Sequence, residues 1–421
     1  QLGMKVVVTD HHAVTSLPPE VPVIHPGRED DPSPFPGLAG VGVAYKLAWA
    51  LGKELAGAER VSPGHREFLL RALALVALGT VADVVPLLGE NRVLVSYGLR
   101  AFQGLRHVGL EALIAECGLD AGSIASEQVA FRLAPHINAA GRLGRAEDAL
   151  ELLLTDDAHR ARSLARALAA ANRRRKEIER EMLSACVERL DAQDLGEPSL
   201  PIVIEGRGWH AGVAGIVAAR LVDRYQRPVF VIAVEDGLGR GSARSPASRP
   251  LTPLYDGARR HAISIGGHER AGGLTVEEGC IDELRSALEE AARASAGVSA
   301  GEEGPPVRRY DLDLAGDSID LSLLSSIERL APFGEGNPLP RFRVGGLSVD
   351  GSPRLVGRGE DHLAFRVRTG RRRLRAIHFN GARHARRLTR EGPLTLIAEL
   401  TLNRYRGSAS VELRVLDYLE S

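Results

Sequence analysis

Hydrophobic residues recur with two different periods in the first third of the chain. Residues 4–9 form an apolar, β-branched run that is typical of a buried β-strand. Apolar positions then recur at helical spacing around residues 40–56 and 66–79. A strand followed by helices predicts an α/β domain over residues 1–150. In the second helical stretch, the apolar residues that share one face are Leu69, Leu70, Leu73 and Val76.

One long helix is predicted from about residue 157 to residue 193, where the sequence has almost no helix breaker. A helix of ~35 residues is ~50 Å long, so we expect it to connect two domains. Basic residues cluster midway, at positions 173–176. They either face a groove or form a solvated helix surface, and we favour the solvated surface. The apolar residues at helical spacing are Leu164, Leu168, Ala171, Ile178, Met182 and Leu190.

The remaining pattern predicts a second α/β unit and a small β-barrel. Strands at Pro201–Glu205 and Pro228–Val234 flank a helix at about 212–225. Residues 294–309 are rich in Gly, Ser, Glu and Pro and indicate a linker or surface loop. Beyond residue 340, apolar and polar residues alternate between turn signals, as in an OB-fold. The clearest strands there are Leu363–Val367, Leu374–Phe379, Leu394–Leu402 and Val411–Tyr418.

Charge is distributed unevenly along a chain that is neutral overall. The 421 residues, enough for two or three domains, include 54 basic and 54 acidic residues, so no global field attracts nucleic acid. Residues 341–421 nevertheless contain 17 Arg and 8 acidic residues, a net charge of +9. Residues 274–340 carry a net charge of −9. The basic segment could therefore face phosphates.

Cysteine content and hydropathy indicate a cytoplasmic protein. The cysteines Cys117, Cys186 and Cys280 are far apart and lack metal-ligand spacing, which is typical of a reduced cytosolic protein. No segment approaches ~18 uninterrupted apolar residues and no signal peptide is recognisable, so we expect no membrane partner. Because only a few residues precede the first predicted strand, we expect the N-terminal part of its domain to be missing.

Candidate metal ligands follow the first predicted strand. Asp10, His11 and His12 stand directly after it, and open α/β sheets bind ligands at the carboxyl ends of their strands. Carboxylate and imidazole ligands suit Mn²⁺, Mg²⁺ or Fe better than a structural Zn²⁺. The alternative is that the histidines cap a loop or hydrogen-bond locally. Asp83 interrupts an apolar surround and, because a buried carboxylate without a partner is costly, should be paired, hydrogen-bonded or metal-bound.

Two further motifs join a glycine to polar side chains beside a helix. In Ala134–Gly144, Asn138 and Arg142 precede a predicted helix and could contact a phosphate; alternatively, this is a helix-start loop. In Gly208–Ala218, which contains Trp209 and His210, backbone N–H groups could approach an anion. Trp209 could stack on a base or fill the core, and we favour the core.

Two more motifs are rich in glycine. In Gly239–Ser245, the hydroxyl of Ser242 and the guanidinium of Arg244 could hold a phosphodiester. In Gly266–Gly273, glycine pairs flank His268. Glycine in regular structure costs about 0.5–1 kcal/mol each, so we expect a compensating close approach of the backbone to a ligand. Gly266, Gly267 and His268 are therefore candidate binding residues.

Together these motifs resemble the DHH phosphoesterase superfamily and, within it, the RecJ family of single-strand-specific exonucleases. The Asp10–His12 motif corresponds to the one that names the superfamily, and Asp83 matches its last metal-binding aspartate. Asn138–Arg142 resembles a substrate-contacting segment, and Gly266–His268 resembles the signature of the DHHA1 domain. Pro332–Pro338 resembles the segment that leads into the family's OB-fold. The resemblance covers essentially the whole chain.

This resemblance implies an α/β fold class with five parts. Residues 1–150 would be the C-terminal portion of a truncated, Rossmann-like DHH domain, and residues 151–197 a connecting helix. Residues 198–300 would be the DHHA1 substrate-binding domain. An acidic connecting segment, 301–340, would lead to a C-terminal β-barrel, the OB-fold, at 341–421.

The resemblance also implies roles for individual residues. His11 and Asp83 would bind Mn²⁺ or Mg²⁺, Asp10 would be a ligand or the partner of one, and His12 would contact the scissile phosphate or assist proton transfer. The reaction would be metal-assisted 5′→3′ hydrolysis of single-stranded DNA in repair and recombination. The residues expected to bind substrate are Asn138, Arg142, Trp209, His210, Ser242, Arg244, Gly266, Gly267 and His268.

The family also implies partners and a mode of selection. A groove too narrow for a duplex would explain selectivity for single strands, and the OB-fold would add affinity. Single-strand-binding protein and a helicase are candidate protein partners. We expect a monomer.

The chain departs from the family pattern before its Asp-His-His. The family has an Asp-x-Asp motif and another aspartate there, whereas this sequence begins too late to contain them. Two-metal chemistry typically needs several carboxylates, so at most half a site is expected. Two hypotheses follow: an active exonuclease recorded as a fragment, or a catalytically incomplete chain that only binds single strands. Retention of Asp10, His11, His12 and Asp83 favours the first hypothesis. A hydrolase of nanoRNA or cyclic dinucleotides fits poorly, because those enzymes lack the basic terminal barrel.

Overall fold

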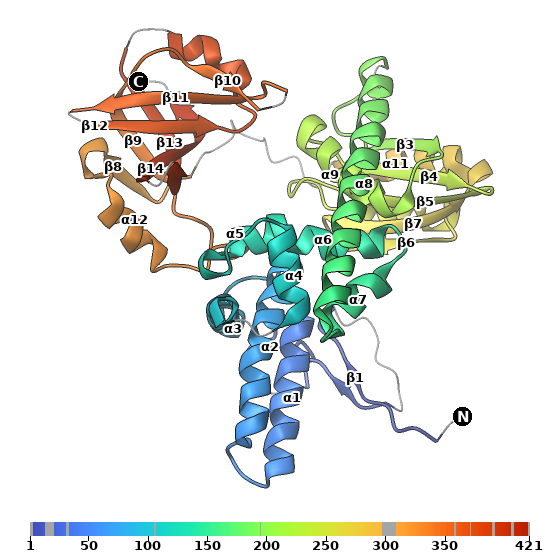
Figure 1. Ribbon diagram of the computed structural model, residues 1–421. Coiled ribbons are helices and arrows are strands. Elements are labelled where there is room, and N and C mark those ends of the chain that lie inside the picture. The colour runs from blue at the N-terminus through green and yellow to red at the C-terminus, as the bar shows by residue number, and fades with distance from the viewer. Residues whose placement is uncertain are drawn as a thin grey trace. The chain divides into compact units, whose positions relative to one another are not determined.

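The computed structural model divides into two compact units (Figure 1). The first unit comprises Gln1–Arg106, Asp120–Ala134 and Pro305–Ser421, and the second comprises His107–Leu119 and Pro135–Gly304. The structure describes residues 3–12, 21–30, 33–104, 107–193, 195–296, 309–357, 359–370, 372–389, 392–405 and 408–419. Most of the predicted linker at 294–309, and Pro18, Pro19 and Pro32 of the proline-rich stretch, lie outside these residues.

The first strand is shorter than its sequence predicts. Strand β1 (Val8–Thr9) pairs in parallel with β2 (Val23–Ile24), and both contain two residues. The backbone of β1 is held by hydrogen bonds from Val8 to Pro22 and from Asp10 to Ile24. Val6 and Val7 are 55% and 54% exposed because no described strand covers them. The β-branched run therefore leaves an exposed apolar edge.

Helices build the rest of the N-terminal part. Helix α1 (Gly40–Ala56) matches its predicted range, and α2 (Pro63–Ala82) is longer than predicted at both ends. Ser62 caps α2 by accepting a hydrogen bond from the His65 amide. Leu70 is 45% exposed, so it does not belong to the buried face of α2, which includes Leu69, Leu73 and Val76. The other elements here are α3 (Gly89–Ala101), η1 (Phe102–Gly104), η2 (Ala121–Ser123), α5 (Ser126–Gln128) and the π-helical η3 (Val129–Leu133).

The predicted long helix is present as α8 (Ala158–Asp191). Asp157 caps it through the amides of His159 and Arg160. Its C-terminal half contributes Met182, Cys186 and Leu190 to the core of the second unit. All of α8 belongs to that unit. That it connects two domains stays a prediction. The other helices that precede the sheet are α4 (Val108–Glu116), α6 (Ala134–Arg142) and α7 (Ala146–Leu154).

The basic cluster of α8 is largely solvated, as favoured from the sequence. Arg173, Arg174 and Lys176 are exposed. Arg175 differs, because only 12% of its side chain is exposed and it forms an ion pair with Glu179 at 2.9 Å. Arg175 also donates two hydrogen bonds to Oδ1 of the buried Asn172.

A five-stranded sheet with the order β3-β4-β5-β7-β6 forms the centre of the second unit. Strands β3 (Ile202–Arg207) and β4 (Val229–Glu235) are parallel and joined through α9 (Ala211–Tyr225), as the alternating pattern predicts. Helices α8 and α9 cover one face, and α10 (Thr252–Ala258) and α11 (Ile281–Ala296) cover the other. The remaining elements are β5 (Leu238–Arg244), η4 (Arg259–His261), β6 (Ser264–Gly267), β7 (Ala271–Glu277) and η5 (Glu278–Cys280).

The C-terminal segment forms a closed barrel of the predicted OB type. Strands follow the order β9-β11-β12-β14-β13, and β13 pairs again with β9 to close the ring. Buried residues alternate with half-buried or exposed ones along β11, as the sequence pattern indicates. The elements are β8 (Leu312–Ala315), η6 (Gly316–Ser318), α12 (Leu321–Glu328), β9 (Phe342–Val349), β10 (Arg354–Val356), β11 (His362–Thr369), β12 (Arg372–His378), η7 (Ala382–Thr389), β13 (Leu394–Tyr405) and β14 (Ser408–Leu419).

The segment 330–337, which leads into the barrel, is bound to the loop after α2. The Leu87 amide donates to the Glu335 carbonyl at 2.7 Å. The Arg92 guanidinium donates to the Leu330 carbonyl, and the Ser126 hydroxyl to the Phe333 carbonyl. Side-chain and backbone donors of the N-terminal part thus hold this segment at three points.

Within the described residues, no helix is long and apolar enough to span a bilayer. Cys117 and Cys186 are buried, and Cys280 is half-buried.

Candidate functional site

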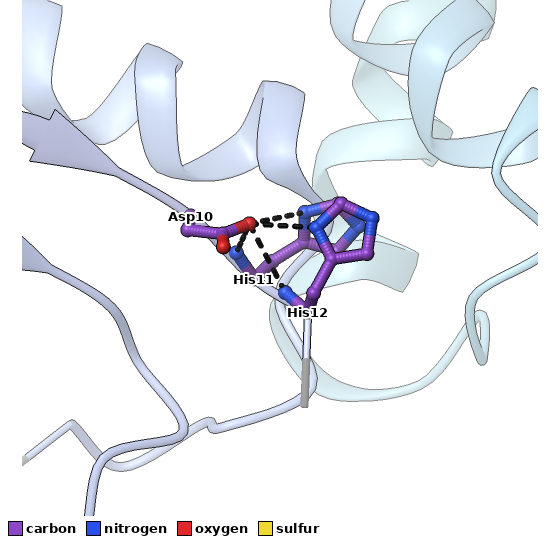
Figure 2. Close-up of side chains that lie close together, drawn as sticks. All are labelled: Asp10, His11 and His12. Atoms are coloured by element: carbon purple, nitrogen blue, oxygen red, sulfur yellow. Dashed lines mark hydrogen bonds and ion pairs between the residues drawn. The ribbon is translucent and has the colours of Figure 1, made fainter. Parts of the chain in front are cut away.

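The Asp10–His12 motif folds back on itself directly after β1 (Figure 2). Asp10 Oδ1 accepts hydrogen bonds from the backbone amides of His11 at 2.7 Å and of His12 at 3.2 Å. The same oxygen lies 2.7 Å from His12 Nδ1. The His12 imidazole, and then the two amides, hold the pKa of Asp10 well below its usual range. The carboxylate is therefore ionised across the physiological pH range.

His11 lies between two carboxylates. Its Nε2 is 2.8 Å from Asp83 Oδ2, and its Nδ1 is 3.9 Å from Asp10 Oδ1. Asp83 is the C-cap residue of α2, which ends beside the motif. A Cβ at Gly40, the first residue of α1, would lie 2.7 Å from His11 Nδ1, so glycine makes room for the ring.

The prediction that Asp83 has a partner is confirmed, but the prediction that it is buried is wrong. Its side chain is 41% exposed, because the apolar run before it is the last turns of α2 and Asp83 already stands beyond that helix. The histidines also make the local contacts of the alternative interpretation, such as His12 to Asp10. The same geometry therefore satisfies both interpretations of the motif.

The donor set fits a divalent cation. Ligand atoms of Asp10, His11 and His12 all lie within 4.8 Å of one another, and this is the one such cluster among the described residues. Two neighbouring ligands of an octahedral ion with bonds of about 2.1 Å are about 3 Å apart. The 2.8 Å between His11 Nε2 and Asp83 Oδ2 is close to that separation. Mixed imidazole and carboxylate ligands suit Mn²⁺ or Mg²⁺.

A second cluster of predicted residues lines a cavity of about 670 Å³ in the second unit. Asn138 and Arg142 come from α6, and Ser242 and Arg244 from β5. Gly212, in the first turn of α9, also lines the cavity. Four residues from two separate motifs are thus brought together.

Both motifs lie in regular secondary structure. Asn138–Arg142 lies inside α6, which continues directly from η3, rather than before a helix. Ser242 and Arg244 lie in β5, which pairs with β4 and with β7 along its whole length. A Cβ at Gly239 would lie 2.7 Å from the Ile232 side chain, so this glycine serves packing between strands.

The cavity has the electrostatics of an anion site. Burial lowers the pKa of Arg244, and the neighbouring Arg142 lowers it further. Burial, and then Arg175, lower the pKa of Arg142. Among the described residues, neither Arg142 nor Arg244 has a carboxylate within 4.0 Å, and none of those that line the cavity is acidic. Among the described residues, the Arg142 guanidinium donates to the Gly212 carbonyl and the Arg244 guanidinium to the Ala243 carbonyl.

The start of α9 adds backbone donors to this cavity. His210 is the N-cap residue, and its Nδ1 accepts a hydrogen bond from the Gly212 amide at 3.1 Å. A Cβ at Gly215 would lie 3.0 Å from Arg244 Nη2, so glycine allows the helix to approach the guanidinium. A helix N-terminus beside two arginines favours an anion.

The other predicted binding residues do not line this cavity. Trp209 packs over Gly206 against the core, with the Arg189 guanidinium 5.8 Å from its ring centroid, as the favoured core interpretation requires. Gly266 and Gly267 end β6, the edge strand of the sheet. Gly267 has a φ of +148°, and a Cβ there would overlap the Ala271 carbonyl. His268 is exposed in the following turn.

Sequence reasoning missed residues that support the metal-ligand cluster. Gly40 makes room for His11, and the buried His25 places its Nε2 2.6 Å from the His12 carbonyl oxygen. Asn91 is fully buried in the first turn of α3. A glycine at a helix start was the one signal available for Gly40. His25 and Asn91 carry no local pattern, because their partners are distant in the sequence.

Two family models match the chain. The RecJ OB domain matches residues 310–417, and the DHHA1 domain matches residues 199–294. The chain is 32% identical to the single-stranded-DNA-specific exonuclease RecJ of Bacillus subtilis over 99% of its own length, and 35% identical to that of Dickeya dadantii over 98%. It covers 51% of the Bacillus protein and 73% of the Dickeya protein. The chain thus spans about half the length of some relatives that it matches.

The solved structures show the same similarity. RecJ of Thermus thermophilus in complex with Mn²⁺ is 33% identical, with a TM-score of 0.80 over 100% of this chain and 59% of that one. The complex of the same protein with Mg²⁺ gives a TM-score of 0.70 at 32% identity, over 95% of this chain and 58% of that one. The fold, including the barrel, is therefore the fold of these proteins.

Proposed function

Because the chain belongs to the RecJ family of single-stranded-DNA-specific exonucleases, we propose that it hydrolyses phosphodiester bonds of single-stranded DNA with Mn²⁺ or Mg²⁺. The observation that carries this proposal is the cluster of Asp10, His11 and His12, with Asp83 2.8 Å from His11. The 5′→3′ direction, the role in repair and recombination, and the cytoplasmic location are proposed from the family.

Each residue of the cluster has a distinct proposed role. His11 and Asp83, together with Asp10, would hold the ion, which when bound would activate water and neutralise charge on the transferring phosphate. Ionised Asp10 favours the His12 tautomer with the proton on Nδ1, which leaves Nε2 as an acceptor. His12 is 72% exposed, so this nitrogen can contact the scissile phosphate or take a proton.

The arginine cavity of the second unit would bind backbone phosphates. Arg142 and Arg244 supply guanidinium donors, Asn138 and Ser242 supply neutral ones, and these groups match phosphate oxygens. Trp209, His210, Gly266, Gly267 and His268 remain proposed contacts by resemblance. The barrel, with 17 Arg in residues 341–421, would add sequence-independent affinity. Single-strand-binding protein and a helicase stay proposed partners of a monomer.

A second candidate function is binding of single strands without cleavage. The described cluster contains two carboxylates, whereas sites that hold two ions about 3.5–4 Å apart typically use more. Under this alternative the arginine cavity and the barrel would bind the single strand, and the cluster would catalyse no hydrolysis.

Degradation of 5′-labelled single-stranded DNA by the 421-residue chain with Mn²⁺, beside a His11→Ala variant, separates the two functions. Release of mononucleotides that the variant loses is the expected result. Binding in an anisotropy assay without any release would establish the second function instead. Equal release by both proteins would contradict the assigned metal cluster.

A further inference from the structure

Asn91 hydrogen-bonds to two separate backbone segments beside the metal-ligand cluster. It lies in the first turn of α3 and is fully buried. Its Nδ2 donates to the carbonyl of Gly37 at 2.7 Å and to that of Pro86 at 3.1 Å, and its Oδ1 accepts from the Ala39 amide at 3.2 Å. A carboxamide offers two donor hydrogens and one acceptor oxygen, and Asn91 uses both ends.

The three partners belong to the two segments that contact the His11–Asp83 pair. Pro86 stands in the loop 83–88 that begins with Asp83, between α2 and α3. Gly37 and Ala39 lead into α1, whose first residue, Gly40, lies against the His11 ring. Asn91 therefore sets the spacing between the loop that begins with Asp83 and the segment 37–40 that supports His11.

The loop 83–88 needs such a restraint. Asp83, Val84 and Leu88 are exposed, so little packing holds them. Val84 has a φ of 59°, a conformation that a β-branched residue adopts only when its surroundings impose it. The hydrogen bond from Asn91 to Pro86 is one tether of this loop, and the bond from Leu87 to Glu335 is another.

We propose that Asn91 is a positioning residue, which fixes the Asp83 carboxylate against the His11 imidazole so that the two can share one cation. The inference rests on the proposed metal-dependent function. Asn91 touches neither the ion nor the substrate. It acts through the backbone at Pro86, Gly37 and Ala39.

The test compares the 421-residue chain with Asn91→Ala, Asn91→Asp and Val95→Ala. Asn91→Asp keeps the shape of the side chain and an acceptor for the Ala39 amide, but it replaces the donor to Pro86 and Gly37 with an oxygen. Val95 is fully buried on the same helix one turn later, so Val95→Ala matches the loss of packing without removing these hydrogen bonds. The two measurements are hydrogen exchange of the Val84 and Leu87 amides without metal, and Mn²⁺ affinity by calorimetry.

Both Asn91 variants are expected to exchange the hydrogen-bonded amides of Val84 and Leu87 at least tenfold faster and to bind Mn²⁺ at least tenfold more weakly. Val95→Ala should lower the melting temperature and change neither quantity more than twofold. Unchanged exchange and affinity in a folded Asn91→Asp would overturn the inference, as would equal effects in Val95→Ala. If the wild-type chain binds no Mn²⁺, the proposed function fails, while exchange still decides whether Asn91 holds the loop.

Discussion

The metal-ligand cluster and the arginine cavity are built in opposite ways. The cluster follows a strand of two residues, and its charges are paired internally, Asp10 with His12 and Asp83 with His11. The cavity lies among long elements, α6, α9 and β5, and neither of its two arginines has a carboxylate within 4.0 Å among the described residues. Without a ligand, the carboxylates of the cluster have histidine partners, whereas no acidic residue lines the cavity beside the two arginines.

This difference assigns a different energetic role to ligand binding in each region. In the cluster, a cation must replace the existing contacts between histidine and carboxylate, so its affinity depends on how well the backbone fixes the ligands. In the cavity, an anion relieves repulsion between Arg142 and Arg244; burial, and then this repulsion, lower the pKa of Arg244. The cation affinity of the cluster should therefore depend mainly on the geometry of its ligands, and the anion affinity of the cavity mainly on the charge of its arginines.

The largest expected effect is that of Asp83→Asn on the cluster. The substitution keeps the shape but removes a charged ligand, so Mn²⁺-dependent cleavage should fall by at least about 100-fold and Mn²⁺ affinity with it. Binding of single-stranded DNA should hold, because the cavity is untouched. Initial rates, calorimetry and anisotropy measure the three quantities. Glu67→Gln, at an exposed position of α2, is the control, and an equal loss there would refute the assignment.

The next largest effect is that of Arg244→Met on DNA binding. A hydrogen bond to a charged group contributes about 1.5–3 kcal/mol, so affinity should fall about 10-fold to 100-fold. The slope of log K against log salt should shrink by about 0.7, because one phosphate contact is lost. Mn²⁺ affinity should not change. The control is Arg293→Met on α11, which removes an arginine that pairs with Glu289. It should not change the DNA affinity measured by anisotropy. Loss of Mn²⁺ affinity in Arg244→Met would contradict the assignment of cation binding to the cluster alone.

Inorganic phosphate should stabilise the protein through the same cavity. At ten times its Kd a ligand contributes about 1.4 kcal/mol, which corresponds to a rise of about 3–6 °C in melting temperature. Differential scanning fluorimetry measures the melting temperature in phosphate, and chloride at equal ionic strength is the reference. The double variant Arg142→Met, Arg244→Met should lose the response. A response that survives in the double variant would place the anion site elsewhere.

The smallest effect concerns the proton on Asp10. Its pKa is held below the usual range, chiefly by His12, so the carboxylate stays ionised as the pH falls through the range where ordinary aspartates titrate. Stability from this group is present above the ordinary pKa and is lost only as the pH falls through the lowered one. In His12→Ala, the carboxyl ¹³C resonance of Asp10 should titrate closer to the usual pH. An unchanged titration would show that the backbone amides alone hold the charge.

Sequence periodicity predicted the regular parts of the fold well. Helix α1, the long α8 and the strands of the barrel follow from apolar spacing, because each buries one continuous face. The failures have tertiary causes. The glycine-rich β5 was not predicted as a strand, although its Gly239 lies against Ile232 and Val276 in the middle of the sheet. The length of β1 depends on pairing with β2, which no local pattern encodes.

The candidate site divides in the same way. The motif Asp10–His12 and the partner of Asp83 were visible because charged residues in an apolar surround need an explanation. The grouping of Arg142 with Arg244 was proposed from resemblance, and the structure brings them to one cavity. Asn91 was invisible, since its three partners lie on loops that the sequence does not place beside it.

The hydrogen bonds that hold segment 330–337 to the N-terminal part of the first unit have a consequence for protein engineering. Leu87, Arg92 and Ser126 donate to the carbonyls of Glu335, Leu330 and Phe333, so the segment is a shared part rather than a spacer. The barrel is therefore not an interchangeable module with a boundary at its first strand. A chimera that grafts another nucleic-acid-binding barrel onto this chain must keep residues 330–337 and make its junction after them.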